Sequence, residues 1–216
     1  MTTAAAPLPD RAALVRRSVL LNRLTLGYNL VEGLVALAAG VAAGSVALVS
    51  FGVDSGIELG ASVVALWRLS HEGDAARVAR AEPVAHRLIG GLLLLLAAYV
   101  AWEAGGDLRR GERPGTSMVG LALAAASVVV MPLLARAKRR VGRALRSSAL
   151  VAESRQTAFC TWLSAILLAG LALNALLGWW WADPVAALAM VPIIGWEGVQ
   201  AVRGRDLCGC GDACHG

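Results

Sequence analysis

Long apolar runs recur along the whole chain and are separated by short segments in which basic residues gather. Each run has the roughly 19 or more residues that a helix needs to cross a hydrocarbon core about 30 Å thick. The runs are continuous rather than alternating, which excludes the strands of a membrane β-barrel. The pattern therefore predicts an all-α, polytopic membrane protein with six transmembrane helices. We place them at 20–42, 46–67, 84–104, 117–135, 148–177 and 181–202.

The composition supports this interpretation. Hydrophobic residues make up 57% of the chain, charged residues make up 16%, and the mean hydropathy is +0.64. This balance lies far outside that of soluble globular domains, and apolar stretches along the whole length are not a signal peptide. We expect a polar cytoplasmic N-terminal lead at 1–17, the six-helix membrane domain at 18–204 and a Cys- and His-rich cytoplasmic tail at 205–216.

Basic residues lie mainly at one end of the predicted helices. Lys and Arg number four up to Arg23, four from Arg68 to Arg87, six from Arg136 to Arg146 and two in the C-terminal tail. The loops on the opposite side contain only Arg109, Arg110 and Arg113. Because cytoplasmic loops of membrane proteins are enriched in Lys and Arg, we expect both termini in the cytoplasm.

This distribution also explains the net charge of +5, which does not indicate nucleic-acid binding because the basic residues flank apolar runs. Lys138 is the one lysine among 20 basic residues. We interpret the arginine bias as typical of a GC-rich bacterial genome and expect the protein in the bacterial cytoplasmic membrane, surrounded by lipid. The tryptophans at 179–181 are expected to anchor the last two helices at the membrane interface.

Two acidic residues lie deep in the second apolar run. Asp54 and Glu58 are four residues apart and therefore share one helix face. Charge in the bilayer interior costs a few kcal/mol or more, so such residues are usually functional. Two ionised carboxylates this close repel each other, so the pair is expected to share a proton or bind a cation. Hydrogen bonding to a neighbouring helix is the structural alternative.

The fifth run carries a second polar face. Glu153, Gln156 and Cys160 have the spacing i, i+3, i+7, which brings a carboxylate, an amide oxygen and a thiol to one side of a helix. Cys is a soft ligand, so its combination with carboxylates favours Zn²⁺, Cd²⁺ or Co²⁺ over Mg²⁺ or Ca²⁺. For Cys160 alone, an inert packed thiol is an equally good interpretation.

Other polar residues in the runs are candidate accessory groups. Glu32, with Asn29 one turn earlier, is expected to line a polar path or to add ligands. Asp183 precedes Pro184, and we interpret it as the N-cap of the sixth helix. Glu197 lies near the cytoplasmic end of that helix and is expected to reach the surface or to pair with Arg203.

These residues and their neighbours resemble the six-helix membrane domain of the cation diffusion facilitator family, from about Asn22 to Gly204. The family begins its second helix with Ser-x-Ala-Leu followed by two acids four apart. In the fifth helix, Ser-x-Ala-Leu and an acid precede His-x-x-x-Asp. The matching positions are Ser45, Ala47, Leu48, Asp54 and Glu58, then Ser147, Ala149, Leu150 and Glu153, and finally Trp180 to Pro184 at the start of the sixth helix. Gln156 stands where the family has His, and Cys160 where it has Asp.

The resemblance implies a tetrahedral transport site formed by Asp54, Glu58, Gln156 and Cys160. It also implies that a divalent metal enters from the cytoplasm while protons return. The chain looks like a divergent bacterial branch without the usual cytoplasmic regulatory domain, so a homodimer would be held by the membrane helices alone.

The C-terminal tail adds four potential ligands within eight residues: Cys208, Cys210, Cys214 and His215. Its flexible glycines favour metal capture from the cytosol, and a reactive, disordered tail is the alternative. No nucleophile and base pair or phosphate-binding loop is evident, so we expect no enzyme and no fixed cofactor. The sequence thus predicts a proton-coupled exporter of Zn, Cd or Co ions, and the alternative is a non-transporting metal-binding or sensing membrane protein.

Overall fold

The computed structural model describes residues 11–70, 75–145 and 148–203, and in these ranges it contains six α-helices and no strand. All six are long and apolar enough to cross a membrane, which confirms the predicted all-α, six-span fold. The helices are α1 (Arg11–Ala43), α2 (Val46–Ser70), α3 (Ala75–Arg110), α4 (Met118–Leu145), α5 (Ser148–Leu177) and α6 (Ala182–Val202).

Several helices extend beyond the apolar runs that predicted them. The first begins at Arg11, inside the segment that we assigned to a polar lead, and α4 continues through the basic residues to Leu145. A helix does not end where the hydrocarbon ends, because its backbone hydrogen bonds are as good in water and its Arg stems can lie along apolar surface. Hydrophobicity alone therefore gives the membrane part of each helix and not its full length.

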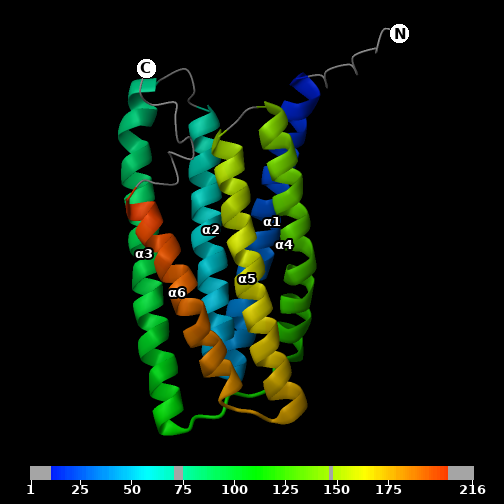
Figure 1. Ribbon diagram of the computed structural model, residues 1–216, viewed down its shortest axis with the longest axis vertical. Coiled ribbons are helices and arrows are strands. Elements are labelled where there is room, and N and C mark those ends of the chain that lie inside the picture. The colour runs from blue at the N-terminus through cyan, green and yellow to red at the C-terminus, as the bar shows by residue number, and fades with distance from the viewer. Residues whose placement is uncertain (1–10, 71–74, 146–147, 204–216) are drawn as a thin grey trace, which may run out of the picture.

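The six helices form an up-and-down bundle: α1 begins at the upper end in Figure 1, and α6 runs upward and ends in the upper half. Helix α2 packs against α1, α3, α5 and α6 and is therefore the most central element. The remaining pairings are α1 with α4, α3 with α6, α4 with α5 and α5 with α6. This arrangement brings the polar faces of α1, α2, α4 and α5 toward one interior region.

Local signals in the sequence set the helix ends at the lower turns. The hydroxyl of Ser45 accepts a hydrogen bond from the Leu48 amide at 3.1 Å, so Ser45 is the N-cap of α2. Ser117 does the same for α4 through the Gly120 amide at 3.0 Å. Glycines with positive φ follow the C-terminal ends of α1, α3 and α5, where a left-handed residue stops a helix: Gly44, Gly111 and Gly178.

Small residues allow the closest helix crossings. At Gly90 of α3, an added Cβ would lie 2.7 Å from the Gly198 carbonyl oxygen of α6. At Gly170 of α5, it would lie 2.5 Å from the Cβ of Ala186. Such contacts are typical of membrane bundles, in which van der Waals packing replaces the hydrophobic effect as the force between helices.

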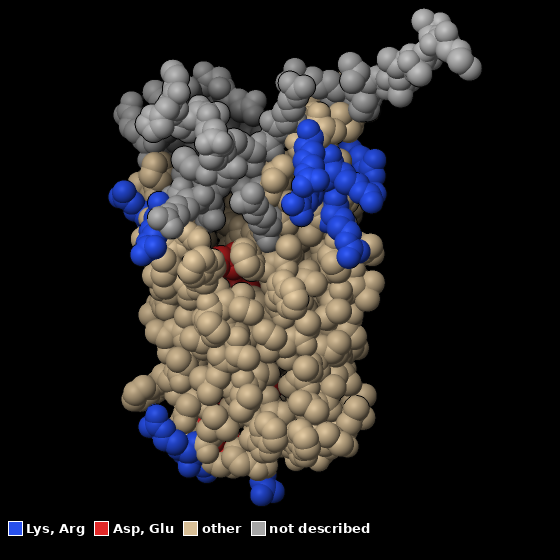
Figure 2. Space-filling view, viewed as in Figure 1, with Lys and Arg blue, Asp and Glu red and all other residues tan. Residues whose placement is uncertain are grey.

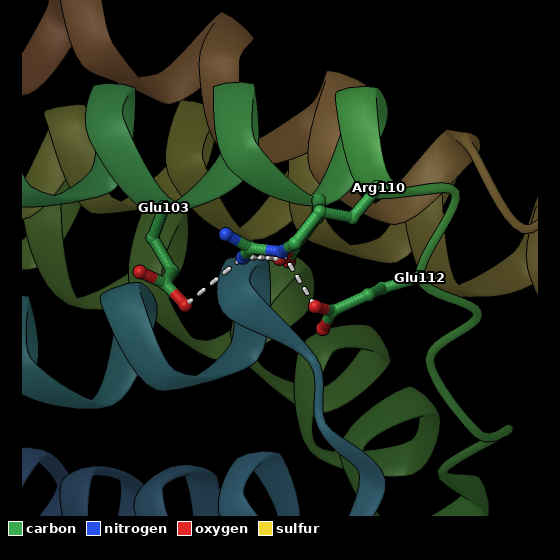
Figure 3. Close-up of polar contacts among 4 residues, drawn as sticks. Glu103, Arg110 and Glu112 are labelled. Atoms are coloured by element: carbon green, nitrogen blue, oxygen red, sulfur yellow. Dashed lines mark hydrogen bonds and ion pairs between the residues drawn. The ribbon is translucent and has the colours of Figure 1, made fainter.

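The outer surface is apolar between two charged ends, as Figure 2 shows. At its lower end, the basic residue Arg110 has acidic partners. Arg110 contacts Glu112 at 2.6 Å, Asp107 at 2.9 Å and Glu103 at 3.7 Å, in the arrangement of Figure 3. The positive charge of Arg110 is thus offset by these three acidic residues.

Candidate metal site

The polar faces of α2 and α5 meet in the interior. Asp54 is 2% exposed and Cys160 is 1% exposed. The thiol of Cys160 donates to Asp54 Oδ2 across 3.8 Å, although the two residues are 106 positions apart. The structure therefore brings together a carboxylate and a sulfur that were singled out from helical spacing alone.

Glu58 lies one turn from Asp54 on the same face and is also buried. Its Oε2 accepts a hydrogen bond from Asn29 Nδ2 of α1 at 2.9 Å. The carboxylate also interacts with the Cys160 thiol and, electrostatically, with Asp54. Three helices thus contribute to one cluster of Asn29, Asp54, Glu58 and Cys160, which we call the interior site.

Two oxygens of the interior site are buried without a hydrogen-bond partner among the described residues, namely Asp54 Oδ1 and Asn29 Oδ1. Leaving a buried acceptor unsatisfied costs about 1–3 kcal/mol, and more if it is charged, so such atoms call for an explanation. Carboxylate and amide oxygens are atom types that can ligate a cation. Across the described chain, however, no three His, Cys, Asp or Glu side chains already enclose a metal position. In this structure the side chains are therefore not arranged around an ion.

Gln156, which the resemblance places in the transport site, lies one turn before Cys160 on α5 and is half-buried. No hydrogen bond in the described part of the chain joins it to Asp54, Glu58 or Cys160. Glu153 lies in α5 as well, but its side chain falls outside the described residues. Cys208, Cys210, Cys214 and His215 also lie outside them, so the tail hypothesis stays a prediction.

Glu32 forms a separate cluster one turn along α1 from Asn29. Its Oε2 accepts from Ser55 at 3.1 Å, and its Oε1 accepts from the hydroxyl of Ser127 on α4. Ser127 is also hydrogen-bonded to the Tyr28 hydroxyl at 2.7 Å. Both carboxylate oxygens are therefore satisfied by side-chain hydroxyls. Glu32 interacts electrostatically with Asp54 and Glu58, but in the described part of the chain no hydrogen bond joins it to either residue.

The interpretation of Asp183 as the N-cap of its own helix is wrong. The N-cap of α6 is Trp181, and it makes no side-chain capping bond. Asp183 lies in the first turn and reaches α2 instead, accepting from the Ser45 hydroxyl at 2.5 Å and the Ala47 amide at 3.4 Å. It therefore stabilises the start of α2 from another helix. In the turn that precedes α6, the rings of Trp179 and Trp181 stack with their centroids 5.0 Å apart.

Two charged residues lie closer to the interior site than the sequence indicated. Glu197, expected to reach the surface, is 9% exposed and interacts electrostatically with Cys160. Lys138, which we counted among the basic residues of a cytoplasmic loop, is fully buried on α4. One signal was available: Lys138 falls on the stripe of α4 positions that the bundle buries, between Ala135 and Gly142.

The family model described as the cation efflux transmembrane domain matches residues 23–203, which is most of the chain and spans all of the interior site. No curated protein matches the sequence.

Proposed function

Because the chain belongs to the cation efflux family, whose members are membrane transporters of cations, we propose that it moves a zinc- or cadmium-type ion through the interior site in exchange for protons. The observation that carries this proposal is the contact between Asp54 and Cys160, beside a buried, unpartnered carboxylate oxygen. The thiol of α5 and the carboxylates of α2 meet in the buried interior of the bundle.

The ligands that we propose are Asp54, Glu58 and Cys160, with the orphaned oxygen of Asn29 as the fourth. Zn²⁺ prefers four ligands drawn from S, N and O atoms, whereas Mg²⁺ and Ca²⁺ require six or more oxygens. One sulfur among oxygens therefore favours a borderline or soft ion. Gln156 lies one turn before Cys160 on α5, closer to the basic end of the bundle. We propose that it lines the path by which the ion reaches the interior site and that it ligates the ion on the way.

Proton exchange follows from the charges. Asp54 and Glu58 attract a dication, and after its release two close carboxylates in a low-dielectric interior require positive charge again. In the simplest transport cycle, protons supply this positive charge. The basic end of the bundle, where α1 begins, is proposed as the cytoplasmic end from which the metal enters. Acidic atoms are visible in a recess in the upper half of the surface in Figure 2, which supports access from that end.

The test is metal flux into proteoliposomes, followed with a cadmium-sensitive dye while a second dye reports internal pH. Asp54→Asn should abolish Cd²⁺ flux and the accompanying proton movement while preserving side-chain shape. Glu103→Gln is the matched control, because Glu103 is a partly exposed acid near the C-terminal end of α3. This variant should transport Cd²⁺ normally. Full flux in Asp54→Asn would contradict the proposal. Cd²⁺ binding without flux in the unaltered protein would favour the sensing alternative.

A further inference from the structure

Glu32 is a buried acid that the proposed ligand set leaves unexplained. It lies in α1 with 1% of its surface exposed, and no Lys, Arg or His of the described chain forms a salt bridge with it. An ionised carboxylate is strongly disfavoured inside a membrane protein unless a cation or several hydrogen-bond donors surround it. The neighbours of Glu32 therefore decide which charge states it can adopt.

Three hydroxyl groups from three helices surround this carboxyl. Ser55 of α2 contacts Oε2 at 3.1 Å, Ser127 of α4 contacts Oε1, and the Tyr28 hydroxyl of α1 lies 2.7 Å from Ser127 Oγ. Each serine hydroxyl also lies 3.0 Å from a carbonyl oxygen one turn earlier in its own helix. Five close contacts between oxygens thus share the hydrogens of only three hydroxyl groups.

A proton on Glu32 fits this arrangement. A hydroxyl donates one hydrogen and accepts up to two, so three hydroxyls fill at most three of the five contacts. A protonated Oε1 donates to Ser127 Oγ, and the Ser127 hydrogen turns to the carbonyl of its own helix, so that four contacts are filled. With Glu32 ionised, Ser127 and Ser55 turn their hydrogens to the two carboxylate oxygens. Rotation of hydroxyls alone therefore accommodates both charge states.

Glu32 lies beside the interior site along two helices. On α1 it is one turn from Asn29, which holds Glu58, and residues three apart on a helix have Cβ atoms about 5–6 Å apart. On α2, Ser55 directly follows Asp54. A dication bound to the interior site would thus lie about one helical turn from the Glu32 carboxyl. Charges at such a distance interact strongly where the effective dielectric constant is low.

We propose that Glu32 is a proton-binding site distinct from the metal ligands, which carries a proton while the interior site holds no metal and gives it up to water when a dication binds. The O–H bond of the carboxyl breaks, its electron pair stays on Oε1, and the proton leaves to the solvent. This inference rests on the proposed function, because it names one of the groups that carry the exchanged protons. The dication repels this proton, and by linkage the proton weakens metal binding by the same factor.

Other titratable groups face the same region from the surrounding helices, namely Tyr28 of α1, Asp54 and Glu58 of α2, and Cys160 of α5. Helix α4 contributes Ser127 here, and its buried Lys138 lies about three turns further along that helix. A measurement of total proton release therefore includes several groups. The experiment has to separate the proton of Glu32 from the others.

The experiment records the infrared difference between metal-free and Cd²⁺-bound protein, full-length and in detergent, with Cys208, Cys210 and Cys214 replaced by Ser to silence the tail. A protonated carboxyl has a C=O stretching band that an ionised carboxylate lacks. In the same samples, a pH-sensitive dye in weakly buffered solution counts the protons released per bound ion. Glu32→Gln is the test variant, because an amide has the shape of the protonated acid and no proton to release. Glu103→Gln is the matched control, because that acid is partly exposed near the C-terminal end of α3.

We expect a C=O band that disappears when Cd²⁺ binds and that is present in Glu103→Gln but absent from Glu32→Gln. Glu32→Gln should release up to about one proton fewer per Cd²⁺, while its Cd²⁺ affinity changes by no more than about threefold. Ser55→Ala assigns the band independently. If Oε1 carries the proton, Oε2 is the carbonyl oxygen that accepts from Ser55, so loss of this hydrogen bond shifts the Glu32 band to higher frequency.

Either of two results overturns the inference: every C=O band of the unaltered protein persists in Glu32→Gln, or the two proteins release the same number of protons per Cd²⁺. If the melting curve shows that Glu32→Gln does not fold, an unshifted spectrum in Ser55→Ala overturns it instead. Failure of the proposed function looks different, because Asp54→Asn then binds Cd²⁺ as the unaltered protein does. If the function holds and only this inference fails, Asp54→Asn abolishes binding while Glu32→Gln behaves like the control.

Discussion

Asp54 and Glu32 are two buried carboxylates in the same bundle, and their surroundings differ sharply. Glu32 is 1% exposed and has both oxygens hydrogen-bonded to serine hydroxyls. Asp54 is equally buried, but one oxygen has a thiol at 3.8 Å and the other has no hydrogen-bond partner in the described chain. Burial is therefore the same for both acids, and we propose that hydrogen-bond satisfaction is what separates the proposed metal ligand Asp54 from Glu32.

The difference follows from the composition of the neighbouring helices. Around Glu32, Ser55 and Ser127 supply donors at the positions where α2 and α4 face α1. Around Asp54, the facing residue of α5 is Cys160, whose thiol is a weak donor but a strong metal ligand once deprotonated. A carboxylate left with weak partners can exchange them for an ion at little cost, and one with strong partners cannot. The following predictions sharpen this comparison.

The largest effect is expected at Asp54. Replacing it by Asn removes an anionic ligand without changing shape, so Cd²⁺ affinity should fall at least about 100-fold, more than loss of an outer-shell partner usually costs. Stability should not fall, because the orphaned oxygen contributes no hydrogen bond. Calorimetric titration and thermal melting measure the two quantities. A loss of less than threefold in affinity would remove Asp54 from the ligand set.

Asp183→Ala should act on stability instead. It removes the hydrogen bonds from Ser45 and Ala47 at the start of α2, and hydrogen bonds to a charged group are worth about 1.5–3 kcal/mol. Unfolding in detergent should occur at correspondingly lower denaturant concentration. The folded fraction should bind Cd²⁺ with unchanged affinity. Glu112→Ala is the control, because that exposed acid should have little effect on unfolding.

Cys160→Ser is expected to change the choice of metal. Loss of the sulfur should weaken Cd²⁺ binding roughly tenfold and Mn²⁺ binding much less, because a hydroxyl is a hard ligand. The readout is the ratio of the two dissociation constants. Serine at Cys208, Cys210 and Cys214 should leave this ratio at the interior site unchanged. An unaltered Cd²⁺ to Mn²⁺ ratio in Cys160→Ser would mean that the thiol is only packed.

Glu32→Gln should have the smallest effect on the metal. Its charge acts on Asp54 and Glu58 only electrostatically, so Cd²⁺ affinity should fall by no more than about threefold. The amide can still accept from Ser55 or Ser127 with its oxygen. A loss as large as that of Asp54→Asn would show that Glu32 ligates the ion and would erase the distinction drawn between the two acids.

Much of the fold could be predicted from the sequence, because lipid imposes a simple rule on its helices. A run of apolar residues of sufficient length must be helical in a membrane, and all six helices follow that rule. Helical spacing likewise put Asp54 with Glu58, and Gln156 with Cys160. Which helices meet does not follow from spacing. The resemblance to a known family supplied the pairing of α2 with α5, and the structure now places Asp54 against Cys160.

The parts that were missed depend on contacts between residues far apart in the chain. Asp183 looked like a cap for its own helix, because nothing local shows that Ser45 lies beside it. Lys138 stands among arginines at a helix end, so it was counted as a topology signal although its side chain turns inward. Whether Asn29 or Gln156 faces Asp54, Glu58 and Cys160 is a matter of side-chain orientation, which helical periodicity does not determine.

The most direct test of the central claim is X-ray absorption spectroscopy of cadmium bound to the full-length protein whose tail cysteines are replaced by Ser. The account predicts one sulfur among oxygen neighbours of the bound ion, and it predicts that this sulfur signal disappears in Cys160→Ser. A spectrum with oxygen neighbours only, identical with and without Cys160, would contradict it.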